Sequence, residues 1–289
     1  MGLLWPLDYS GAWTLGAATE LRGTGLHYGE EAFVRLYPSH RAGIRVRWSD
    51  GGPATSVTPD KVRESSLCTT LELCGRRLAT VEHLLAAIAG CGLTHIEMEV
   101  SGREVPLLDG SARVWVEAIA KVGLVPAITL PRPALRLQKS LVRQRGCSVI
   151  TATPARSLTL VGIIDFPQTV IGKQILAIEL TPERFVNEIA PARTFGFCDQ
   201  LEQLRQAGLI RGGTLDNALV CDGNRWLNPP LRFVDEPVRH KLLDLLGDLA
   251  LVGLPFPTAQ ILVYRGSHVL HTDLASALLD LYPSPHSLD

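Results

Sequence analysis

The chain has 289 residues, of which 46% are hydrophobic and 20% charged, and its formal net charge is −1. This composition is typical of a soluble globular protein with two domains or one large one. The near-neutral charge excludes a general attraction to nucleic acid, so we expect no nucleic-acid partner. The six cysteines lack C-x-x-C spacing, so neither a disulfide framework nor a zinc knuckle is indicated, and a cytoplasmic location is expected.

The first 15 or so residues are predicted to form a loose leader. They are mildly apolar but carry no basic n-region, so they do not resemble a signal peptide. No apolar run approaches the length of a transmembrane helix. We therefore expect no stable membrane anchor and at most a peripheral contact with a membrane.

In the first half of the chain, alternating apolar and polar residues predict strands over residues 32–38, 44–48 and 94–100. Between them, T-V-E-H-L-L-A-A-I-A-G predicts a helix that has Thr80 as its N-cap and ends near Gly90. A second helix is expected over residues 112–122.

Three prolines in residues 126–133 make this segment the best linker candidate, which predicts domains 1–127 and 128–289. In the second half, strands are expected over residues 135–142, 148–153, 158–166 and 259–264. Helices are expected over residues 182–189, 199–206, 235–254 and 270–281. Each half thus has strands followed by helices, which predicts an α+β protein built from two similar domains.

The helix over residues 235–254 has two stripes. Apolar residues recur at helical spacing on one of them. On the other, His240, Asp244 and Asp248 stand at i, i+4 and i+8 and therefore line up along one side. A solvated face with a favourable His–Asp pair is the simpler interpretation, but polar groups in so apolar a stretch are costly unless they are paired or bind a metal. The helix alone makes a metal site plausible and no more.

A second informative stretch is T-V-E-H, in which Glu82 and His83 lie about 100° apart around a helix. By itself this pair is better explained by the helix dipole and by packing. Together with His240 and Asp244, however, it supplies three ligands and one carboxylate base, the arrangement expected of catalytic zinc. His268 is a lone histidine that would need an orienting carboxylate, and Asp248 is the natural candidate.

Several motifs follow one another in a familiar order: G-T-G-L-H-Y-G, S-L-C-T-T-L, T-V-E-H-L-L-A-A-I-A-G, V-P-L-L-D-G-S-A, A-R-T-F-G-F, G-L-I-R-G-G-T-L-D-N-A and L-R-F-V-D-E-P-V-R-H-K-L-L-D-L-L-G-D-L. Through them the chain, from about residue 21 to 280, resembles the LpxC family of UDP-3-O-acyl-N-acetylglucosamine deacetylases, the zinc enzymes of lipid A biosynthesis. The resemblance implies helices sandwiched between two sheets, with a small insert in each domain. It also implies a hydrolase whose substrate is a UDP-linked acylated glucosamine, and we expect a monomer.

The resemblance also implies roles for particular residues. Zinc is expected on His83, His240 and Asp244, with Glu82 as the general base. His268 is expected to be the positively charged acid or electrostatic stabiliser, oriented by Asp248. Either His268 or the protonated Glu82 could give the amine its proton.

On the substrate side, the resemblance implies that Thr194 helps to hold the oxyanion, that Lys241 contacts the sugar or phosphate region and that Phe195 packs against the ligand. Asp165 and Phe166 resemble the positions on the nucleotide side. The second insert is expected to form a passage for the acyl chain, with Ile210, Leu215, Ala218 and Leu219 as its lining; ordinary strand core explains these four residues equally well.

Two places depart from the family pattern or leave it open. Where the family usually has K-S-G-H-x-L-N-N, residues 265–272 read R-G-S-H-V-L-H-T, so that His271 competes with His268 for the role of the acid, although alignment favours His268. The residues that contact the diphosphate are poorly marked, and the basic candidates are Arg143, Arg145, Lys173 and Arg265.

The sequence disfavours three other functions. A non-catalytic homologue that binds a nucleotide sugar or lipid is disfavoured because every metal and base position is present. A different zinc amidohydrolase or a dehydratase is disfavoured by A-R-T-F-G-F and G-G-T-L-D-N. A zinc protease is disfavoured because the sequence has no H-E-x-x-H.

Overall fold

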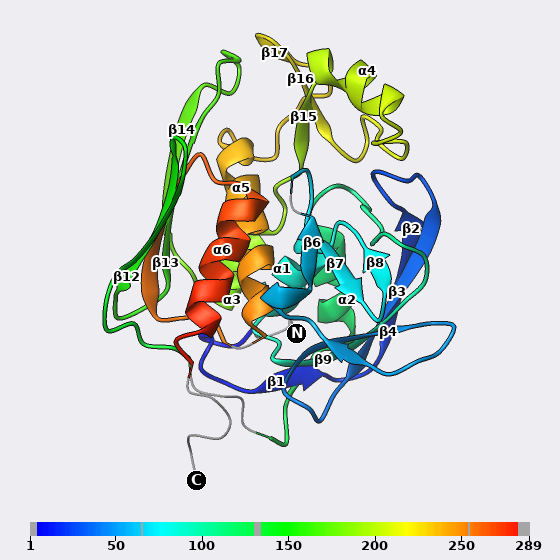
Figure 1. Ribbon diagram of the computed structural model, residues 1–289, viewed down its shortest axis with the longest axis vertical. Coiled ribbons are helices and arrows are strands. Elements are labelled where there is room, and N and C mark those ends of the chain that lie inside the picture. The colour runs from blue at the N-terminus through cyan, green and yellow to red at the C-terminus, as the bar shows by residue number, and fades with distance from the viewer. Residues whose placement is uncertain (1–4, 65, 130–133, 254, 283–289) are drawn as a thin grey trace.

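The computed structural model describes residues 5–64, 66–129, 134–253 and 255–282. In this part of the chain the strands form two five-stranded sheets, two three-stranded sheets and a two-stranded ladder. The first large sheet has the order β2-β3-β9-β4-β5, and the second has the order β11-β12-β18-β13-β14 (Figure 1).

The first half of the chain forms the first large sheet and two helices. Its elements are β1 (Trp13–Leu15), β2 (Thr19–Thr24), β3 (Glu31–Pro38), β4 (Gly43–Trp48), β5 (Thr55–Ser56), the 3₁₀ turn η1 (Pro59–Lys61), β6 (Val62–Glu64), β7 (Thr70–Leu73), β8 (Arg76–Leu78), α1 (Glu82–Gly90), β9 (His95–Val100), α2 (Arg113–Val122) and β10 (Leu124–Pro126). In β3 and β4, buried residues alternate with more exposed ones, as expected of strands that have one face on the core.

The second half forms the second large sheet and the remaining helices. Its elements are β11 (Leu141–Arg145), β12 (Ser148–Pro154), β13 (Thr159–Asp165), β14 (Lys173–Glu179), α3 (Pro182–Arg184), the π-helical turn η2 (Phe185–Ile189), β15 (Phe195–Phe197), α4 (Cys198–Gln206), β16 (Leu219–Asp222), β17 (Arg225–Trp226), α5 (Glu236–Leu249), the 3₁₀ turn η3 (Ala250–Val252), β18 (Ala259–Tyr264) and α6 (His268–Leu279).

The two large sheets have the same topology. In the first, β3 pairs antiparallel with β2 and β9, while β4 runs parallel to β9 and antiparallel to β5. In the second, β12 pairs antiparallel with β11 and β18, while β13 runs parallel to β18 and antiparallel to β14. Each half also inserts a three-stranded sheet between its fifth strand and the helix that precedes β9 or β18. The prediction of two similar α+β units with a small insert in each is therefore confirmed.

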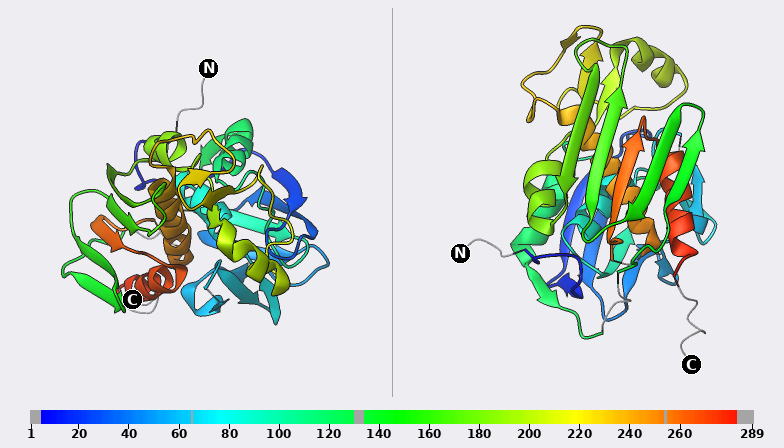
Figure 2. Two further views of the ribbon diagram at one scale, coloured as in Figure 1. Left: turned by 90° about the horizontal axis from the view of Figure 1, so that it is seen from above. Right: turned by 90° about the vertical axis from the view of Figure 1, so that its left-hand side faces the viewer.

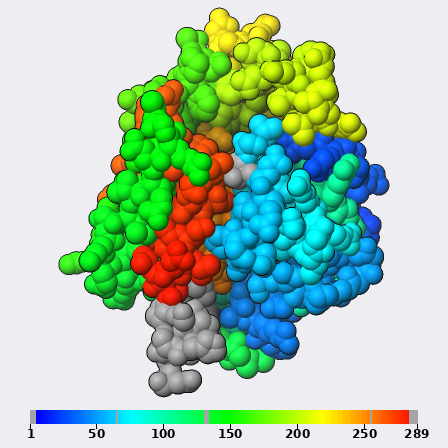
Figure 3. Space-filling view, in the orientation of Figure 1, coloured from blue at the N-terminus to red at the C-terminus, as the bar shows by residue number. Residues whose placement is uncertain are grey.

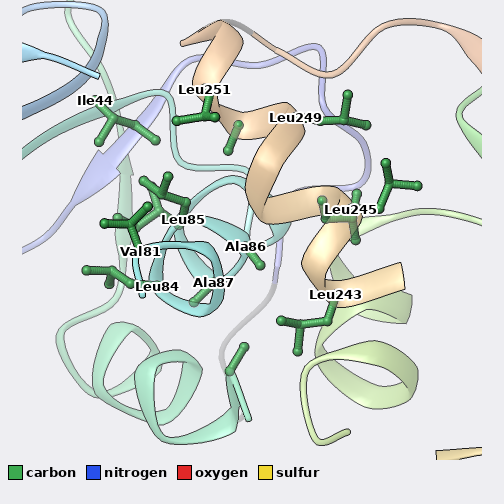
Figure 4. Close-up of a cluster of buried hydrophobic side chains, with 14 of the residues drawn as sticks. Ile44, Val81, Leu84, Leu85, Ala86, Ala87, Leu243, Leu245, Leu249 and Leu251 are labelled. Carbon is green, nitrogen blue, oxygen red and sulfur yellow. The ribbon is translucent and has the colours of Figure 1, made fainter. Parts of the chain in front are cut away.

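Apart from α4, which belongs to the second insert, the helices lie between the two large sheets, as predicted (Figure 2). At the centre α1 packs against α5, and their buried side chains share one hydrophobic core that extends into both halves (Figure 4). The helices approach closely at Gly247, where a Cβ would collide with the backbone carbonyl of Glu82. This contact places the start of α1 beside the last turn of α5.

Three predictions about local structure were wrong. Thr80 is not an N-cap: α1 begins at Glu82 after Val81, and the Thr80 hydroxyl instead donates to the buried carboxylate of Glu104 at 2.8 Å. That carboxylate needs hydrogen-bond donors because it is removed from water. The leader is not loose throughout, since β1 pairs with β10. The strand expected over residues 135–142 begins only at Leu141.

Other elements lay outside the sequence prediction. Edge strand β14 and the strands of the first insert, β6–β8, had not been expected. Part of the predicted linker, residues 130–133, lies outside the described residues, and Pro126 ends strand β10. The helix expected over residues 235–254 is α5 followed by η3; residue 254 is not described. The last helix begins and ends two residues earlier than expected.

Candidate metal centre and active site

Three buried side chains from two helices converge at the α1–α5 contact. His83 comes from α1, and His240 and Asp244 come from α5. Each offers one ligand-type atom, and these atoms all lie within 4.8 Å of one another. Asp244 Oδ1 is 3.3 Å from Nε2 of His240 and 3.6 Å from Nε2 of His83. Two ligands of one tetrahedral zinc ion are roughly 3.3 Å apart, so the spacing suits a single metal ion.

The other atoms of these side chains are held by hydrogen bonds. His240 donates from Nδ1 to the carbonyl of Ala192 at 3.1 Å, which leaves Nε2 facing the cluster. Asp244 Oδ2 accepts from Lys241 at 2.8 Å. Asp244 Oδ1, in contrast, is buried and has no hydrogen-bond partner among the described residues. A buried, unpartnered carboxylate oxygen is costly, and a bound cation would satisfy it.

The charge states of the cluster suit a metal as well. Burial lowers the pKa of His240 to about 3, so its imidazole is neutral, the form that binds metal ions. Burial alone would raise the pKa of Asp244, but the charge of Lys241 and the neighbouring histidines together outweigh it and hold this pKa well below its usual range. The carboxylate is therefore ionised at neutral pH.

Glu82 lies next to His83 at the start of α1 and is only 3% exposed. Its Oε2 accepts the backbone N–H of Thr69 at 3.0 Å. Burial raises the pKa of Glu82, although the neighbouring His268 acts in the opposite direction. A carboxylate with a raised pKa is a better proton acceptor than an exposed one.

Asp248, one turn beyond Asp244, is fully buried and accepts three hydrogen bonds. Its Oδ1 accepts the Thr69 hydroxyl at 2.5 Å, and its Oδ2 accepts Nδ1 of His268 at 2.8 Å and Nδ1 of His271 at 3.0 Å. Burial lowers the pKa of His268, but Asp248 outweighs it and raises this pKa to about 9. His268 is therefore positively charged at neutral pH. The expected pairing of Asp248 with His268 is present.

Sequence reasoning did not assign roles to Thr69 or to a second histidine on Asp248. His271 lies three residues after His268, so both face the same side of α6, and this spacing could have shown that they share a partner. Thr69 belongs to S-L-C-T-T-L but is far from Asp248 in sequence, and nothing local links the two residues.

An apolar cavity of about 420 Å³ opens beside this cluster. In the space-filling view, the yellow-green residues of α4 lie above the cyan residues of the first half (Figure 3). The residues predicted for the substrate side that line the cavity are Thr194, Phe195, Phe166, Lys241, Leu215, Ile210, Ala218 and His268. The lining also includes residues that had not been expected, such as Leu26, His27, Leu201 and Leu204.

Aromatic rings shape one side of this cavity. Phe166 and Phe195 meet edge to face with their ring centroids 5.6 Å apart, and the ammonium group of Lys241 lies 5.6 Å from the centroid of Phe195.

Leu219 is fully buried in β16 and is not among the described residues that line the cavity, whereas its neighbour Val220 is. Strand alternation explains this difference, since successive side chains point to opposite faces.

Asp165 and the four basic candidates for the diphosphate are not among the described residues that line the cavity. Asp165 accepts a hydrogen bond from the Tyr264 hydroxyl at 3.1 Å. Arg145 pairs with Asp273 at 2.9 Å, and Arg265 donates to the carbonyl of Asp165 at 3.2 Å. The roles suggested for these residues stay predictions.

Among the described residues, no helix is both long and apolar enough to cross a membrane.

The fold and the buried histidine–carboxylate cluster beside an apolar cavity define a candidate metal-dependent enzyme. A sequence model of one family, described as "LpxC: UDP-3-O-acyl N-acetylglycosamine deacetylase", matches residues 12–280, and the chain belongs to this family of deacetylases. The predicted resemblance is thereby confirmed.

Curated relatives agree with the family assignment. A UDP-3-O-acyl-N-acetylglucosamine deacetylase of Thermosynechococcus vestitus is 46% identical over 92% of this chain and 93% of its own length. A protein of the same name from Synechocystis is 46% identical over 93% of this chain and 99% of its own length. An Arabidopsis thaliana protein named probable UDP-3-O-acyl-N-acetylglucosamine deacetylase 1, mitochondrial, is 37% identical over 92% of this chain and 87% of its own length.

Proposed function

We propose that this chain hydrolyses UDP-3-O-acyl-N-acetylglucosamine to UDP-3-O-acyl-glucosamine and acetate, with zinc as its cofactor, and that it serves lipid A biosynthesis in the cytoplasm. The relatives carry the name of this reaction. The observation that supports it most directly is the convergence of His83, His240 and Asp244 beside an apolar cavity.

The three residues fit a zinc ion. They supply two imidazole nitrogens and one carboxylate oxygen, which is a ligand set found in catalytic zinc sites that keep one position open. Their facing atoms have the spacing of ligands of one ion, and Asp244 Oδ1 otherwise lacks a partner within the described chain. When bound there, zinc supplies a Lewis acid that makes hydroxide available near neutral pH.

Glu82 is proposed as the general base. Its carboxylate belongs to the residue next to His83, and the N–H of Thr69 holds it in place. The raised pKa of Glu82 matches a group that must accept a proton near neutral pH. As water attacks the acetamide carbonyl, Glu82 takes the proton of that water.

His268 is proposed as the positive charge that faces the reacting carbonyl. Asp248 fixes its imidazole through Nδ1, so Nε2 is the atom left to act on the substrate. A cation at this point stabilises the oxyanion as it forms, and Thr194, which also lines the cavity, is proposed to add a hydrogen-bond donor through its hydroxyl. The departing amine receives its proton from His268 or from the newly protonated Glu82.

The cavity is proposed to hold the acyl chain. Its lining comes largely from the second insert, including Ile210, Leu215 and Ala218, and from the aromatic rings of Phe166 and Phe195. Each methylene buried there stabilises the complex by about 0.8 kcal/mol. Lys241 faces the same cavity and is proposed to contact the sugar or phosphate region. Since one chain supplies all these groups, we also infer that the enzyme works as a monomer.

The test is acetate release from the proposed substrate by the wild type and by Glu82→Gln, with the zinc content of both measured. Glu72→Gln is a matched control, because Glu72 lies on β7 and pairs with Arg63 at the surface. We expect Glu82→Gln to retain zinc and to lose at least about 100-fold in kcat, while Glu72→Gln retains full activity. A zinc-loaded wild type that releases no acetate with any acyl length would refute the proposed substrate.

A further inference from the structure

The carboxylate of Asp248 holds two imidazoles on the same oxygen. Oδ2 accepts Nδ1 of His268 at 2.8 Å and Nδ1 of His271 at 3.0 Å, while Oδ1 accepts the Thr69 hydroxyl. All four side chains are buried. The mechanism proposed above uses His268 but leaves His271 without a role.

The proton on the His271 imidazole can be placed from its surroundings. An ionised carboxylate only accepts hydrogen bonds, so Nδ1 of His271 carries the proton that it donates to Asp248. Burial lowers the pKa of His271, so Nε2 is unprotonated and the ring is neutral. Nε2 is buried and has no hydrogen-bond partner in the described part of the chain. It lies against Gly266, where a Cβ would be only 2.6 Å from Nε2.

This arrangement fixes where the ring of His271 can lie. Gly266 has no side chain, which leaves room for the ring next to the turn that precedes α6. Among the described residues, the imidazole makes one hydrogen bond, which it donates to Asp248. The ring of His271 also lies edge to face with that of His268, with their centroids 6.1 Å apart, but its one hydrogen bond goes to the carboxylate that orients His268.

We infer that His271 is a positioning residue which acts through Asp248 on His268. Its N–H stabilises the negative charge on Oδ2 and competes with His268 for that oxygen, so Asp248 binds the proton of His268 less tightly than it would alone. His268 is thereby kept in one orientation and yet remains able to release a proton. This inference rests on the proposed function, because it assumes that His268 acts on the substrate.

Other charges also act on His268, and the test must hold them constant. Those facing it are Glu82 from α1 and Asp244 and Asp248 from α5. Substitution of His271 changes none of them. The effect of His271 can therefore be measured separately from theirs.

The experiment compares the wild type with His271→Leu, which removes the donor, and His271→Asn, which keeps a side-chain N–H. The pKa of His268 is followed by NMR of ¹⁵N-histidine-labelled protein, with and without zinc, and the pH profile of kcat/KM is measured for acetate release. For His271→Leu we expect the pKa of His268 and the basic limb of the profile to rise by about one pH unit. We expect kcat to fall about three- to tenfold with little change in KM. His271→Asn should retain the wild-type values.

The NMR titration does not depend on which substrate the enzyme uses. Failure of the inference can therefore be distinguished from failure of the proposed function. An unchanged pKa of His268 in His271→Leu would overturn the inference, and so would a shift of the same size in His271→Asn. If His271→Leu does not fold, His271→Met replaces it, since methionine fills a similar volume without an N–H donor.

Discussion

At the scale of single residues, Thr69 connects the carboxylates of Glu82 and Asp248, the proposed base and the partner of His268. Its backbone N–H donates to Glu82 and its hydroxyl donates to Asp248, while its own side chain is fully buried. A hydrogen bond to a charged acceptor contributes about 1.5–3 kcal/mol, more than a neutral one. Thr69 therefore holds the proposed base and the partner of His268 in fixed relative positions.

Thr69→Val removes the hydroxyl but keeps the shape of the side chain and the N–H to Glu82. We expect kcat/KM to fall about 10- to 100-fold, the range seen when partners of catalytic or metal-binding groups are lost. Steady-state kinetics with measured zinc content would check this. Thr69→Ser, which retains the hydroxyl, is the matched control, and equal losses in the two variants would contradict the explanation.

The charge of His268 predicts a pH dependence. Asp248 raises the pKa of His268 to about 9 against the opposing effect of burial, so the charged form persists at neutral pH and is lost as the pH rises through about 9. In Asp248→Asn the carboxylate charge is absent, and the pKa of His268 should fall. The basic limb of the kcat/KM profile should then move to lower pH by at least about one unit.

The acid limb serves as the internal control for this variant. It should report Glu82, whose pKa is raised by burial, and Glu82 lies on α1 rather than on α5. We expect this limb to move less than the basic limb in Asp248→Asn. A basic limb that stays near pH 9 would show that another group limits the reaction at high pH.

At the scale of elements, the contact between α1 and α5 sets the geometry of the site. The helices touch at Gly247, which leaves no room for a Cβ next to the carbonyl of Glu82. Gly247→Ala must therefore push the two helices apart, although alanine favours a helix over glycine by up to about 1 kcal/mol. We expect a net loss of about 1–3 kcal/mol in the free energy of unfolding, measured by urea denaturation.

Gly196→Ala is the control for this prediction, because a Cβ there has no atom within 4 Å. It should change the free energy of unfolding by less than about 0.5 kcal/mol. A stable Gly247→Ala with unchanged zinc affinity would mean that the helices adjust without moving the ligands.

The elements predicted well from the sequence are those with a strong local pattern. Helix α5 and strands β3, β4, β13 and β18 have apolar residues at regular spacing, and the spacing alone identifies them. The predictions that failed concern residues whose structure depends on partners far away in the sequence. Thr80 was expected to cap a helix, but its hydroxyl donates a hydrogen bond to Glu104. Residues 13–15 form a strand only because β10 lies beside them.

The residues of the site likewise differ in how well a local sequence pattern predicts them. The i, i+4 spacing placed His240 and Asp244 on one side of a helix. The grouping of His83 with them rested on a count of ligands and on the family resemblance, because no local spacing links α1 with α5. The roles of Thr69 and His271 depend on contacts that no local pattern shows. Both His271 and its neighbour Gly266 lie in the segment that departs from the usual family sequence, and the structure shows that they touch.

At the scale of the whole molecule, the site lies where two similar halves meet. Glu82, His83 and Thr69 come from the first half, while His240, Asp244, Asp248 and His268 come from the second. We propose that the domains are residues 1–127 and 128–289, as the sequence predicts. The buried core of α1 and α5 is continuous across that division, so the halves are expected to unfold together.

A metal ion held by both halves should therefore stabilise the whole molecule. A ligand that binds only the folded state adds about 2.7 kcal/mol at a free concentration 100 times its Kd. We expect removal of zinc by a chelator to lower the Tm, and re-addition of zinc to restore it in proportion to the logarithm of its concentration. Calorimetry should show one transition in both states, because the hydrophobic core joins the halves even without metal.

His83→Ala distinguishes a bridging metal from one held by the second half alone. The substitution removes the only ligand from α1 in the described cluster and leaves His240 and Asp244 on α5. If zinc links the halves, zinc should raise the Tm of this variant far less than that of the wild type. An equal rise in both proteins would show that α5 binds the metal without α1, and that the two halves are joined by their apolar core alone.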